Sequence, residues 1–374
     1  MSKRLLLVLA ALVMVLGVGA VGCAAEEAAP APAEEEEEAP AEEEEEEAPA
    51  APAAKVINWV GQGALPSGMP VHESLAILSA RITEASGGRL VWDAKPAGAV
   101  CPATEEFKAV DSGVLDFCAG GGSYMVGDIR FGSLMSQRCG GMPPLPHLIW
   151  HRAVGAELAN KWYPKYGFNF RDIAGAGCHG LPEGWIHLDK ELKGPDDLKG
   201  LKMRASGDGG VVLTRMGVGA VFMPLGEVFE AMHRGLIDAY ECSNPAFDWS
   251  MGLQEVGKYY YLSPTRAPTE VYQLLVNNDR WNELPDDLKV IVEDCGRAEA
   301  MSYFTRLNSA NAKAIQDFKD FGVTVELLPA SIDEAFLKVA NEYMDELAAE
   351  DEAMAEMLAS HTAFWETWKS LYGG

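Results

Sequence analysis

Apolar and polar residues recur along the chain with two periods, which predict alternating strands and helices. The segment "KVINWVG" (55–61) predicts a strand, and "RLVWDAKP" (89–96) predicts the next one. Between them, residues 69–87 carry apolar side chains at helical spacing, and the pattern stops at Gly87. Because strand and helix patterns alternate in this way, we expect an α/β protein.

One pattern occurs twice in the chain. The segments "FKAVDSGVLDF" (107–117) and "FEAMHRGLIDA" (229–239) both read Phe-x-Ala-apolar-x-x-Gly-apolar-apolar-Asp, and they start 122 positions apart. Each copy predicts the end of a helix, a glycine cap and a new strand. Since each copy lies within a strand–helix–strand series, the repeat favours two α/β lobes of similar construction.

Helical patterns dominate the last quarter of the chain, with one predicted strand at "VTVELLP" (323–329). The helical stretch 287–318 is long for a globular protein, and it either spans both lobes or breaks once near Asn308. We therefore expect a first lobe of residues 55–181 plus about 270–309, and a second lobe of 182–269 plus about 310–374.

The amino-terminal residues have the features of an export signal. Lys3 and Arg4 precede the apolar run 5–18, which is too short for a permanent membrane span, and the run leads to "GAVGC". Cys23 at the end of residues 1–23 resembles the cysteine of a lipobox, to which a lipid is attached; ordinary cleavage with release of the protein is the alternative. The sequence thus predicts an extracytoplasmic location, in the periplasm or on the outer face of the cytoplasmic membrane.

Residues 24–54 consist almost entirely of Ala, Pro and Glu, including thirteen glutamates. Like charges and prolines oppose folding, so we expect a disordered tether that holds the folded part away from the membrane. This tether carries about half of the formal net charge of −26, so the charge says little about the ligand of the folded part. No basic patch indicates a nucleic-acid partner.

Six cysteines follow Cys23, and none has the CxxC spacing of a zinc or redox site. In an exported protein some of them can pair, but their connectivity does not follow from the sequence.

A single arginine stands at a position suited to ligand binding. In "DDLKGLKMRASGDGG" (196–210), the predicted strand Leu201–Arg204 ends at Arg204, directly before a glycine-rich turn. Open α/β sheets bind ligands at the carboxyl ends of their strands, and a guanidinium matches a carboxylate with two hydrogen bonds. A surface ion pair with a nearby aspartate is the alternative.

From Lys55 to about Tyr343 the chain resembles the extracytoplasmic solute-binding subunits of tripartite ATP-independent periplasmic (TRAP) transporters. The resemblance depends on the order and spacing of five stretches: "SGGRLVWDAKPAGAV", "FKAVDSGVLDF", "DLKGLKMRASG", "PLGEVFEAMHRGLIDAYE" and "VGKYYYLSP". It implies a two-lobed, periplasmic-binding-protein-like fold with a cleft between the lobes and long interlobe helices. The run 235–261 looks most like family members that bind 2-oxo acids or small hydroxy acids such as lactate.

The resemblance also implies the residues of a substrate site. Arg204 matches the arginine that binds the substrate carboxylate in this family. The other predicted substrate-binding residues are Asn244, Trp185, Tyr124 and Cys242.

In some members of the family a metal ion bridges the substrate. Glu241 matches a glutamate that helps to coordinate this cation, and Glu183 would replace an amide side chain that usually supplies another ligand. The pair allows a calcium or sodium ion, although a site without metal fits the sequence equally well.

The leading hypothesis is therefore a binding protein, not an enzyme, which captures a small organic acid and delivers it to an ion-gradient-driven TRAP-type permease. A metal-assisted enzyme built from Glu183, Glu241, His179 or Cys178 is one alternative, and no nucleophile–base spacing supports it. A sensor that presents a bound acid to a receptor domain is another. Both a monomer and a homodimer fit the sequence.

Overall fold

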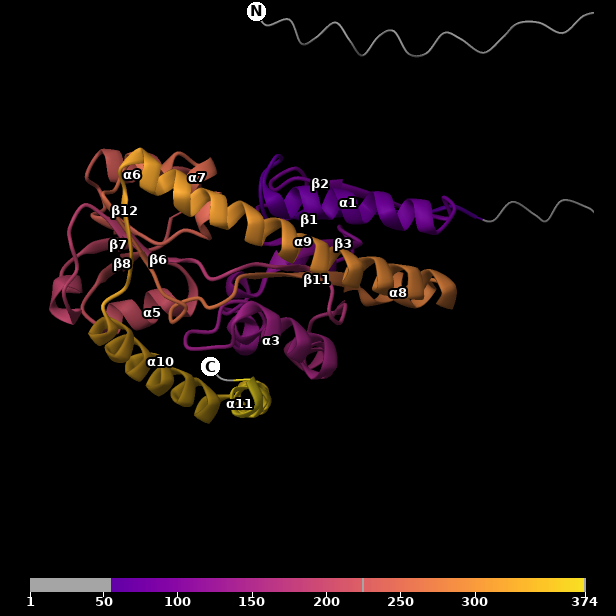
Figure 1. The fold of residues 1–374 in the computed structure, drawn as a ribbon. Coiled ribbons are helices and arrows are strands. Elements are labelled where there is room, and N and C mark those ends of the chain that lie inside the picture. Colours follow the sequence, from indigo (N-terminus) through magenta and orange to yellow (C-terminus); the bar gives the residue numbers. More distant parts are fainter. Residues whose placement is uncertain (1–54, 224, 373–374) are drawn as a thin grey trace, which may run out of the picture. The chain divides into compact units, whose positions relative to one another are not determined.

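A computed structural model describes residues 55–223 and 225–372 (Figure 1). The predicted export signal, Cys23 and the acidic tether lie outside these described residues. Within the described residues, two mixed sheets form the centres of two α/β lobes. The predicted fold class, a two-lobed α/β protein with long carboxyl-terminal helices, is thus confirmed.

The first sheet has the strand order β2-β1-β3-β11-β4, and β5 also pairs with β11. Strand β1 is parallel to β2 and β3, whereas β11 runs antiparallel to β3, β4 and β5. The strands are β1 (Ile57–Gly63), β2 (Leu90–Lys95), β3 (Phe117–Gly121), β4 (Phe170–Asp172), β5 (Cys178–His179) and β11 (Val271–Asn277). All seven residues of β11 are buried, as expected for an inner strand with both faces covered.

The second sheet has the order β12-β10-β6-β9-β7-β8, with β7 parallel to β8 and β9 and with β6 antiparallel to β9 and β10. Its strands are β6 (Gly184–Leu188), β7 (Lys202–Arg204), β8 (Gly219–Val221), β9 (Ala239–Tyr240), β10 (Tyr259–Leu262) and β12 (Thr324–Leu327). Strand β10 enters this sheet, and the chain then crosses directly to β11 of the first sheet.

The repeated sequence pattern forms the same local structure in both lobes. Helices α2 (Glu106–Asp111) and α6 (Val228–His233) each end two residues before a glycine with positive φ, at 73° for Gly113 and 65° for Gly235. Only glycine takes this left-handed conformation without strain, so the glycine ends the helix and turns the chain into β3 or β9. Both strands lie inside their sheets.

Helices cover the sheets and connect the lobes. The longer ones are α1 (Pro70–Ala85), α5 (Gly207–Arg215), α9 (Asp286–Phe321), α10 (Ala330–Glu350) and α11 (Glu352–Tyr372). The shorter ones are α3 (Pro144–Trp150), a π-helical segment (His151–Gly155), α4 (Ala156–Trp162), α7 (Pro245–Ser250) and α8 (Asn278–Glu283). Short 3₁₀ segments occupy Gly122–Tyr124, Arg130–Met135, Tyr163–Tyr166, Pro195–Leu198, Leu225–Glu227 and Leu253–Glu255.

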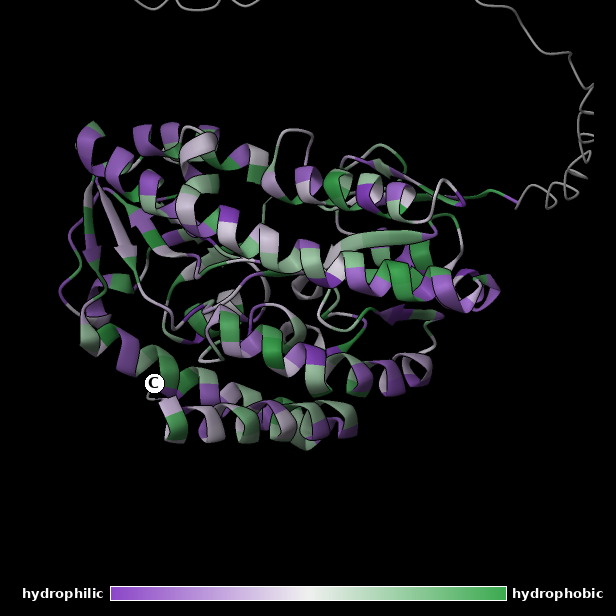
Figure 2. Cartoon of the chain, turned by 45° about the vertical axis from the view of Figure 1, so that its right-hand side comes forward, coloured by the Kyte–Doolittle hydropathy of each residue, from purple (hydrophilic) through white to green (hydrophobic). Residues whose placement is uncertain are grey.

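Helix α9 is continuous and does not break near Asn308. Its buried positions recur every three or four residues from Leu288 to Phe318, the period of one helix face. Figure 2 shows the corresponding mixture of apolar and polar residues along the helices. The helix contacts α1 and β5 in the first lobe and α7 and β12 in the second, so it spans both lobes (Figure 1).

The carboxyl-terminal helix differs from the predicted lobe division. We expected residues 310–374 in the second lobe, and α10 does pack on α5 there. Helix α11, however, contacts α3, α4 and the turn Arg130–Met135, and Met354 and Met357 belong to the core of the first lobe. Apolar side chains on one face of α11 bury themselves against the first lobe, so the chain crosses between the lobes once more than predicted.

All six cysteines of the described part are free thiols, and four of them are buried. Among the described residues, no helix is both long and apolar enough to cross a bilayer.

Several histidines are fully enclosed by the fold. Burial lowers the pKa of His147 to about 3 and that of His187 to about 4. The unfolded chain binds protons at these imidazoles below pH ~6.5, whereas the folded chain does not. These groups therefore contribute their maximum stabilisation of the folded state above pH ~6.5, and this contribution to the free energy of unfolding decreases as the pH is lowered towards about 4.

We expect His147→Gln to lessen the loss of stability between about pH 7 and about pH 5 by roughly 2 kcal/mol relative to the unmodified protein. Urea unfolding at both pH values measures this difference, and His233→Gln, at an exposed histidine, is the matched control. If His147→Gln and the unmodified protein lose the same free energy of unfolding between these pH values, the lowered pKa of His147 in the folded state is wrong.

Candidate binding site

A cleft lies between the two lobes and leads to a small inner cavity. The cleft has a volume of about 660 Å³ and shares Ser123, Tyr124 and Ser206 with the inner cavity. On the same measure the inner cavity has about 10 Å³, roughly the room that one water molecule needs. Its lining comes from both lobes: Gly121, Ser123, Tyr124, Ser136, Gln137, Glu270 and Tyr272 from the first, and Arg204, Ser206, Leu225 and Cys242 from the second.

The strands explain why these residues meet. Strands β3, β7 and β9 end at the cavity, which is lined from opposite lobes by the last residues of β3 and β7 and by the second residue after each of the three strands. The carboxyl ends of parallel strands are the usual ligand-binding edge of an α/β sheet. The structure therefore brings together Arg204, Tyr124 and Cys242, three of the predicted substrate-binding residues.

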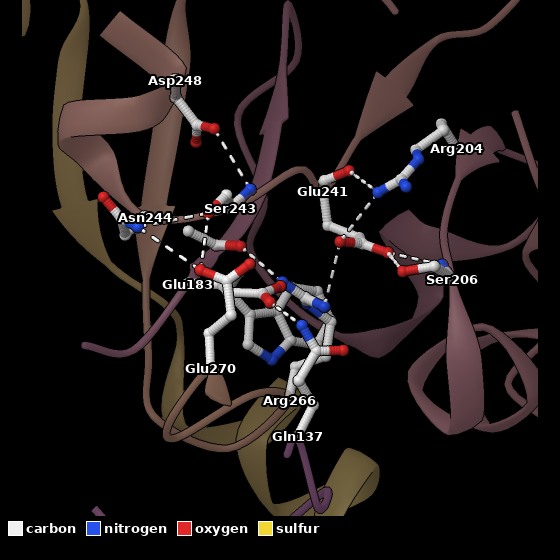
Figure 3. Close-up of polar contacts among 12 residues, drawn as sticks. Gln137, Glu183, Arg204, Ser206, Glu241, Ser243, Asn244, Asp248, Arg266 and Glu270 are labelled. Atoms are coloured by element: carbon white, nitrogen blue, oxygen red, sulfur yellow. Dashed lines mark hydrogen bonds and ion pairs between the residues drawn. The ribbon is translucent and has the colours of Figure 1, made fainter. Parts of the chain in front are cut away.

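Arg204 is the last residue of β7, and its side chain is buried at 3% exposure. Nη1 donates a hydrogen bond to the backbone oxygen of Glu241 at 2.7 Å, and Nε donates to the backbone oxygen of Met223 at 3.3 Å. Within residues 55–223 and 225–372, Nη2 has no hydrogen-bond partner. The guanidinium is thus fixed on one side and retains donors on the other (Figure 3).

Glu241 follows β9 and is the carboxylate around which the site is built. Its Oε2 lies 3.2 Å from Nη1 of Arg204 and 3.2 Å from Nη1 of Arg266. Its Oε1 accepts a hydrogen bond from the backbone nitrogen of Ser206 at 2.5 Å. One fully buried carboxylate therefore binds two guanidiniums and the turn after β7 (Figure 3).

Arg266 is a functional candidate that the sequence analysis missed. It lies in the segment that crosses from β10 to β11, and its Nη2 lies 2.6 Å from Oε2 of Glu183 and donates to the backbone oxygen of Gly184 at 2.9 Å. Its aliphatic stem packs on Gly209, where an added Cβ would lie 3.2 Å from Cγ of Arg266. This contact gives one reason for the glycines in "ASGDGG". A second arginine between two apolar stretches, in "SPTRAPTE" (263–270), was the available signal.

Glu270, which the sequence analysis also missed, is a third buried carboxylate beside the cavity. It accepts hydrogen bonds from Ser243 and Tyr272, each at 2.8 Å, and from Asn244 at 3.4 Å. These three donors carry no charge. Burial raises the pKa of Glu270, and its hydrogen bonds oppose that shift only in part.

Asn244 and Trp185 were predicted to contact the substrate, but the structure places them elsewhere. Asn244 caps α7 by accepting a hydrogen bond from Phe247, and its amide nitrogen donates to Glu270, so it supports the site from behind. The Trp185 ring packs against Phe336 in the second lobe, and its Nε1 donates to Thr265. Neither side chain lines the inner cavity.

The two arginines and three glutamates described above form one buried cluster in which the charges nearly balance. Two guanidiniums face two carboxylates, Glu183 and Glu241, while Glu270 contacts only neutral donors. Burial alone would lower the pKa of Arg266, but Glu241 and Glu183 outweigh burial and raise it. Burial raises the pKa of Glu183, and Arg266 opposes that shift. The cluster is closest to neutral when Glu270 holds a proton.

Glu183 and Glu241 were also the predicted ligands of a cation, and their geometry does not fit that role. Both carboxylates are bound to the same guanidinium, and the amide of Gln137 also donates to Glu183. No group of three or more His, Cys, Asp or Glu side chains suited to a metal ion occurs in the described part of the chain. The position between the two carboxylates is taken by Arg266.

Two α/β lobes, joined by crossing segments and closed around a polar cavity, define the periplasmic-binding-protein class. The family model "Bacterial extracellular solute-binding protein, family 7" (DctP) matches residues 183–351. This match covers less than half of the chain, which is thus similar to this family, the TRAP-type solute-binding proteins, as the sequence resemblance implied. Proteins of this family are receptors that deliver a bound solute to membrane permease subunits.

Similarity extends well beyond the matched segment. The chain is 25% identical over 309 residues to the monocarboxylate 2-oxoacid-binding periplasmic protein of Nostoc sp., covering 82% of this chain and 84% of that one. A TRAP solute-binding protein of Colwellia psychrerythraea, solved with calcium and pyruvate, superposes with a TM-score of 0.79 at 26% identity. The superposition covers 85% of this chain and 98% of that one. A TRAP solute-binding protein of Pseudoalteromonas atlantica, solved with sodium and pyruvate, superposes with a TM-score of 0.78 at 24% identity. The superposition covers 85% of this chain and 97% of that one.

We predict that Glu241→Gln will lower the free energy of unfolding by about 3–5 kcal/mol, because two buried guanidiniums lose their shared carboxylate. Urea unfolding measures the loss. Glu270→Gln is the matched control and should cost less, since Glu270 faces no arginine. Equal losses in the two variants would show that the arginines do not depend on Glu241.

Proposed function

We propose that this protein captures a small 2-oxo or hydroxy monocarboxylate in the cavity between its lobes and delivers it to an ion-gradient-driven TRAP-type permease. The observation that carries the proposal is the guanidinium of Arg204. It is buried, held on one side by Glu241 and Met223, and lines the inner cavity, and its Nη2 has no hydrogen-bond partner among the described residues. A buried guanidinium with unused donors suits a carboxylate better than a neutral solute.

The rest of the lining fits the other end of a 2-oxo or hydroxy acid. Ser123, Tyr124 and Ser136 bring hydroxyl groups to the cavity, and Gln137 brings an amide. Such groups can donate to a carbonyl oxygen or accept from a hydroxyl.

The relatives support the same class of ligand. The Nostoc relative is named for monocarboxylate 2-oxoacids, and the two solved structures contain pyruvate. Calcium or sodium accompanies pyruvate in those structures, which supports the idea that an ion can bridge the substrate in this fold. Whether this chain uses an ion depends on Arg266, which contacts both predicted cation ligands.

Ligand entry requires the cavity to open. A space of about 10 Å³ does not admit an acid of several heavy atoms, so the lobes or the lining side chains must first move apart. The segments 180–183 and 263–270 cross between the sheets and hydrogen-bond to each other, for example from Gly180 to Glu270 at 2.6 Å. These paired crossings are suited to act as the hinge of such a motion.

The side chains that a catalytic mechanism would use are buried, lie outside the cavity or are paired with arginines, which favours a binding role. Cys178 is buried, and burial raises the pKa of its thiol to about 12. Burial holds the pKa of His179 well below its usual range. Neither residue lines the inner cavity, and the carboxylates of Glu183 and Glu241 are bound to arginines. We therefore propose that the protein does not catalyse a reaction on its acid.

We further propose that the mature protein is held outside the cytoplasm by a lipid on Cys23, with residues 24–54 as the tether. Mass spectrometry of the membrane fraction would show the lipid, and Cys23→Ser should release the protein.

Thermal-shift measurements on protein that has been unfolded and refolded to remove retained ligand test the proposed function. Pyruvate, lactate and other small 2-oxo and hydroxy acids are compared with dicarboxylates and sugar acids. A ligand with a micromolar Kd at millimolar concentration adds about 4 kcal/mol of stability. If no small monocarboxylate stabilises the protein, the proposed ligand class is wrong.

Arg204→Ala should raise the Kd for the best acid of that series roughly hundredfold, equivalent to about 3 kcal/mol, because a buried carboxylate loses its partner. Glu241 keeps Arg266 as a partner, so the variant should fold. Arg138→Ala is the matched control: Arg138 is also a buried arginine, but it contacts His361 and does not line the cavity. Isothermal titration with an unchanged Kd in Arg204→Ala would remove Arg204 from the site.

A further inference from the structure

Arg266 occupies the place where the sequence suggested a metal ion. Its guanidinium contacts Glu183 at 2.6 Å through Nη2 and Glu241 at 3.2 Å through Nη1, and its side chain is 3% exposed (Figure 3). A guanidinium offers fixed N–H donors to carboxylate oxygens, and those same oxygens are what calcium would need. Arginine and cation therefore compete for one set of ligands.

The surroundings hold Arg266 in this position. Nη2 also donates to the backbone oxygen of Gly184, and the stem of the side chain lies against Gly209 of α5. Glu183 and Arg266 come from the two segments that cross between the sheets, so their pairing also links these crossings. Leaving this position would strand a buried positive charge and two buried carboxylates.

Arg266 acts on the ligand through other residues. It does not line the inner cavity, whereas Arg204 does. The carboxylate of Glu241 lies between the two arginines, 3.2 Å from each. Arg266 neutralises part of the charge of Glu241. Arg204 is therefore not the only counter-charge of that carboxylate, and its Nη2 can bind an acid.

We propose that Arg266 is a built-in substitute for the cation, a positioning residue that lets this protein bind its organic acid without calcium or sodium. The inference rests on the proposed function for the acid. It also makes a claim about metal alone: the pair Glu183 and Glu241 binds no calcium while Arg266 is present, and becomes able to bind calcium when Arg266 is removed.

The first test uses the unmodified protein, treated with EDTA and transferred to a choline buffer. Calcium alone should produce no saturable heat in isothermal titration and no thermal shift. The Kd for pyruvate should then agree within about twofold among EDTA, millimolar calcium and sodium chloride. A tightening of about tenfold or more by either cation would overturn the proposal.

The second test introduces Arg266→Gln. With the guanidinium gone, calcium alone should bind with a Kd in the range of about 10⁻⁴–10⁻³ M and should raise the thermal midpoint. The double variant Arg266→Gln/Glu183→Gln should lose this response, and Arg266→Lys, which keeps the positive charge, should not gain it. A purely structural role for Arg266 predicts no calcium response in any variant, and that result would overturn the proposal.

The two proposals fail separately. If pyruvate does not bind under any condition but calcium binds only to Arg266→Gln, the ligand class is wrong and the role of Arg266 stands. If Arg266→Gln does not fold, the measurements on the unmodified protein decide: calcium-dependent pyruvate binding overturns the proposal, and calcium-independent binding supports it.

Discussion

The site depends on one buried carboxylate shared by two guanidiniums. Removing Glu241, Arg204 and Arg266 from water is costly, and their mutual attraction offsets that cost only if the hydrogen bonds are well directed. The directed hydrogen bonds come from the Ser206 backbone nitrogen to Oε1 of Glu241 and from Arg204 to the backbone oxygen of Glu241. The 3.2 Å contacts of Oε2 with both arginines are ion pairs that lack hydrogen-bond geometry. A carboxylate held from both sides keeps the two arginines in fixed positions, and thereby determines where a ligand carboxylate can bind.

The connections between the lobes determine where this network forms. Arg204 is the last residue of β7 and Glu241 follows the neighbouring strand β9, whereas Glu183 and Arg266 lie on the segments that lead into and out of that sheet. The charged cluster is therefore placed at the crossings, beside the cavity and beside the proposed hinge. Helix α9 and the packing of α11 on the first lobe add further connections, which limit how the lobes can move apart.

An internal guanidinium and a bound metal ion are two ways to neutralise the buried carboxylates beside the ligand. A bound ion brings a charge that depends on its concentration outside the cell, whereas an arginine is always present and always charged. Related proteins of known structure hold calcium or sodium together with pyruvate. With Arg266 in that role, capture of the acid would not depend on the ions around the cell. The neutral, hydrogen-bonded surroundings of Glu270 fit a cluster that already balances its own charges.

The sequence by itself determined the elements and the class of the protein. Apolar periodicity predicted β1, α1 and β2, and the repeated glycine pattern predicted that Gly113 and Gly235 end helices before strands, because only glycine takes that conformation freely. The position of Arg204 at a strand end predicted that it would reach a ligand edge. Such features are local, since they depend on neighbouring residues in the chain.

Only the tertiary structure decided which distant residues meet. Trp185 and Asn244 stand close to the site in sequence, yet one faces the core and the other caps a helix, because the pleat and the helix start direct their side chains away from the cavity. Arg266 lies 83 positions from Glu183, and nothing local indicates that the two segments cross side by side. The charge pairs of the site depend on the arrangement of the two sheets, and that arrangement is a property of the whole fold.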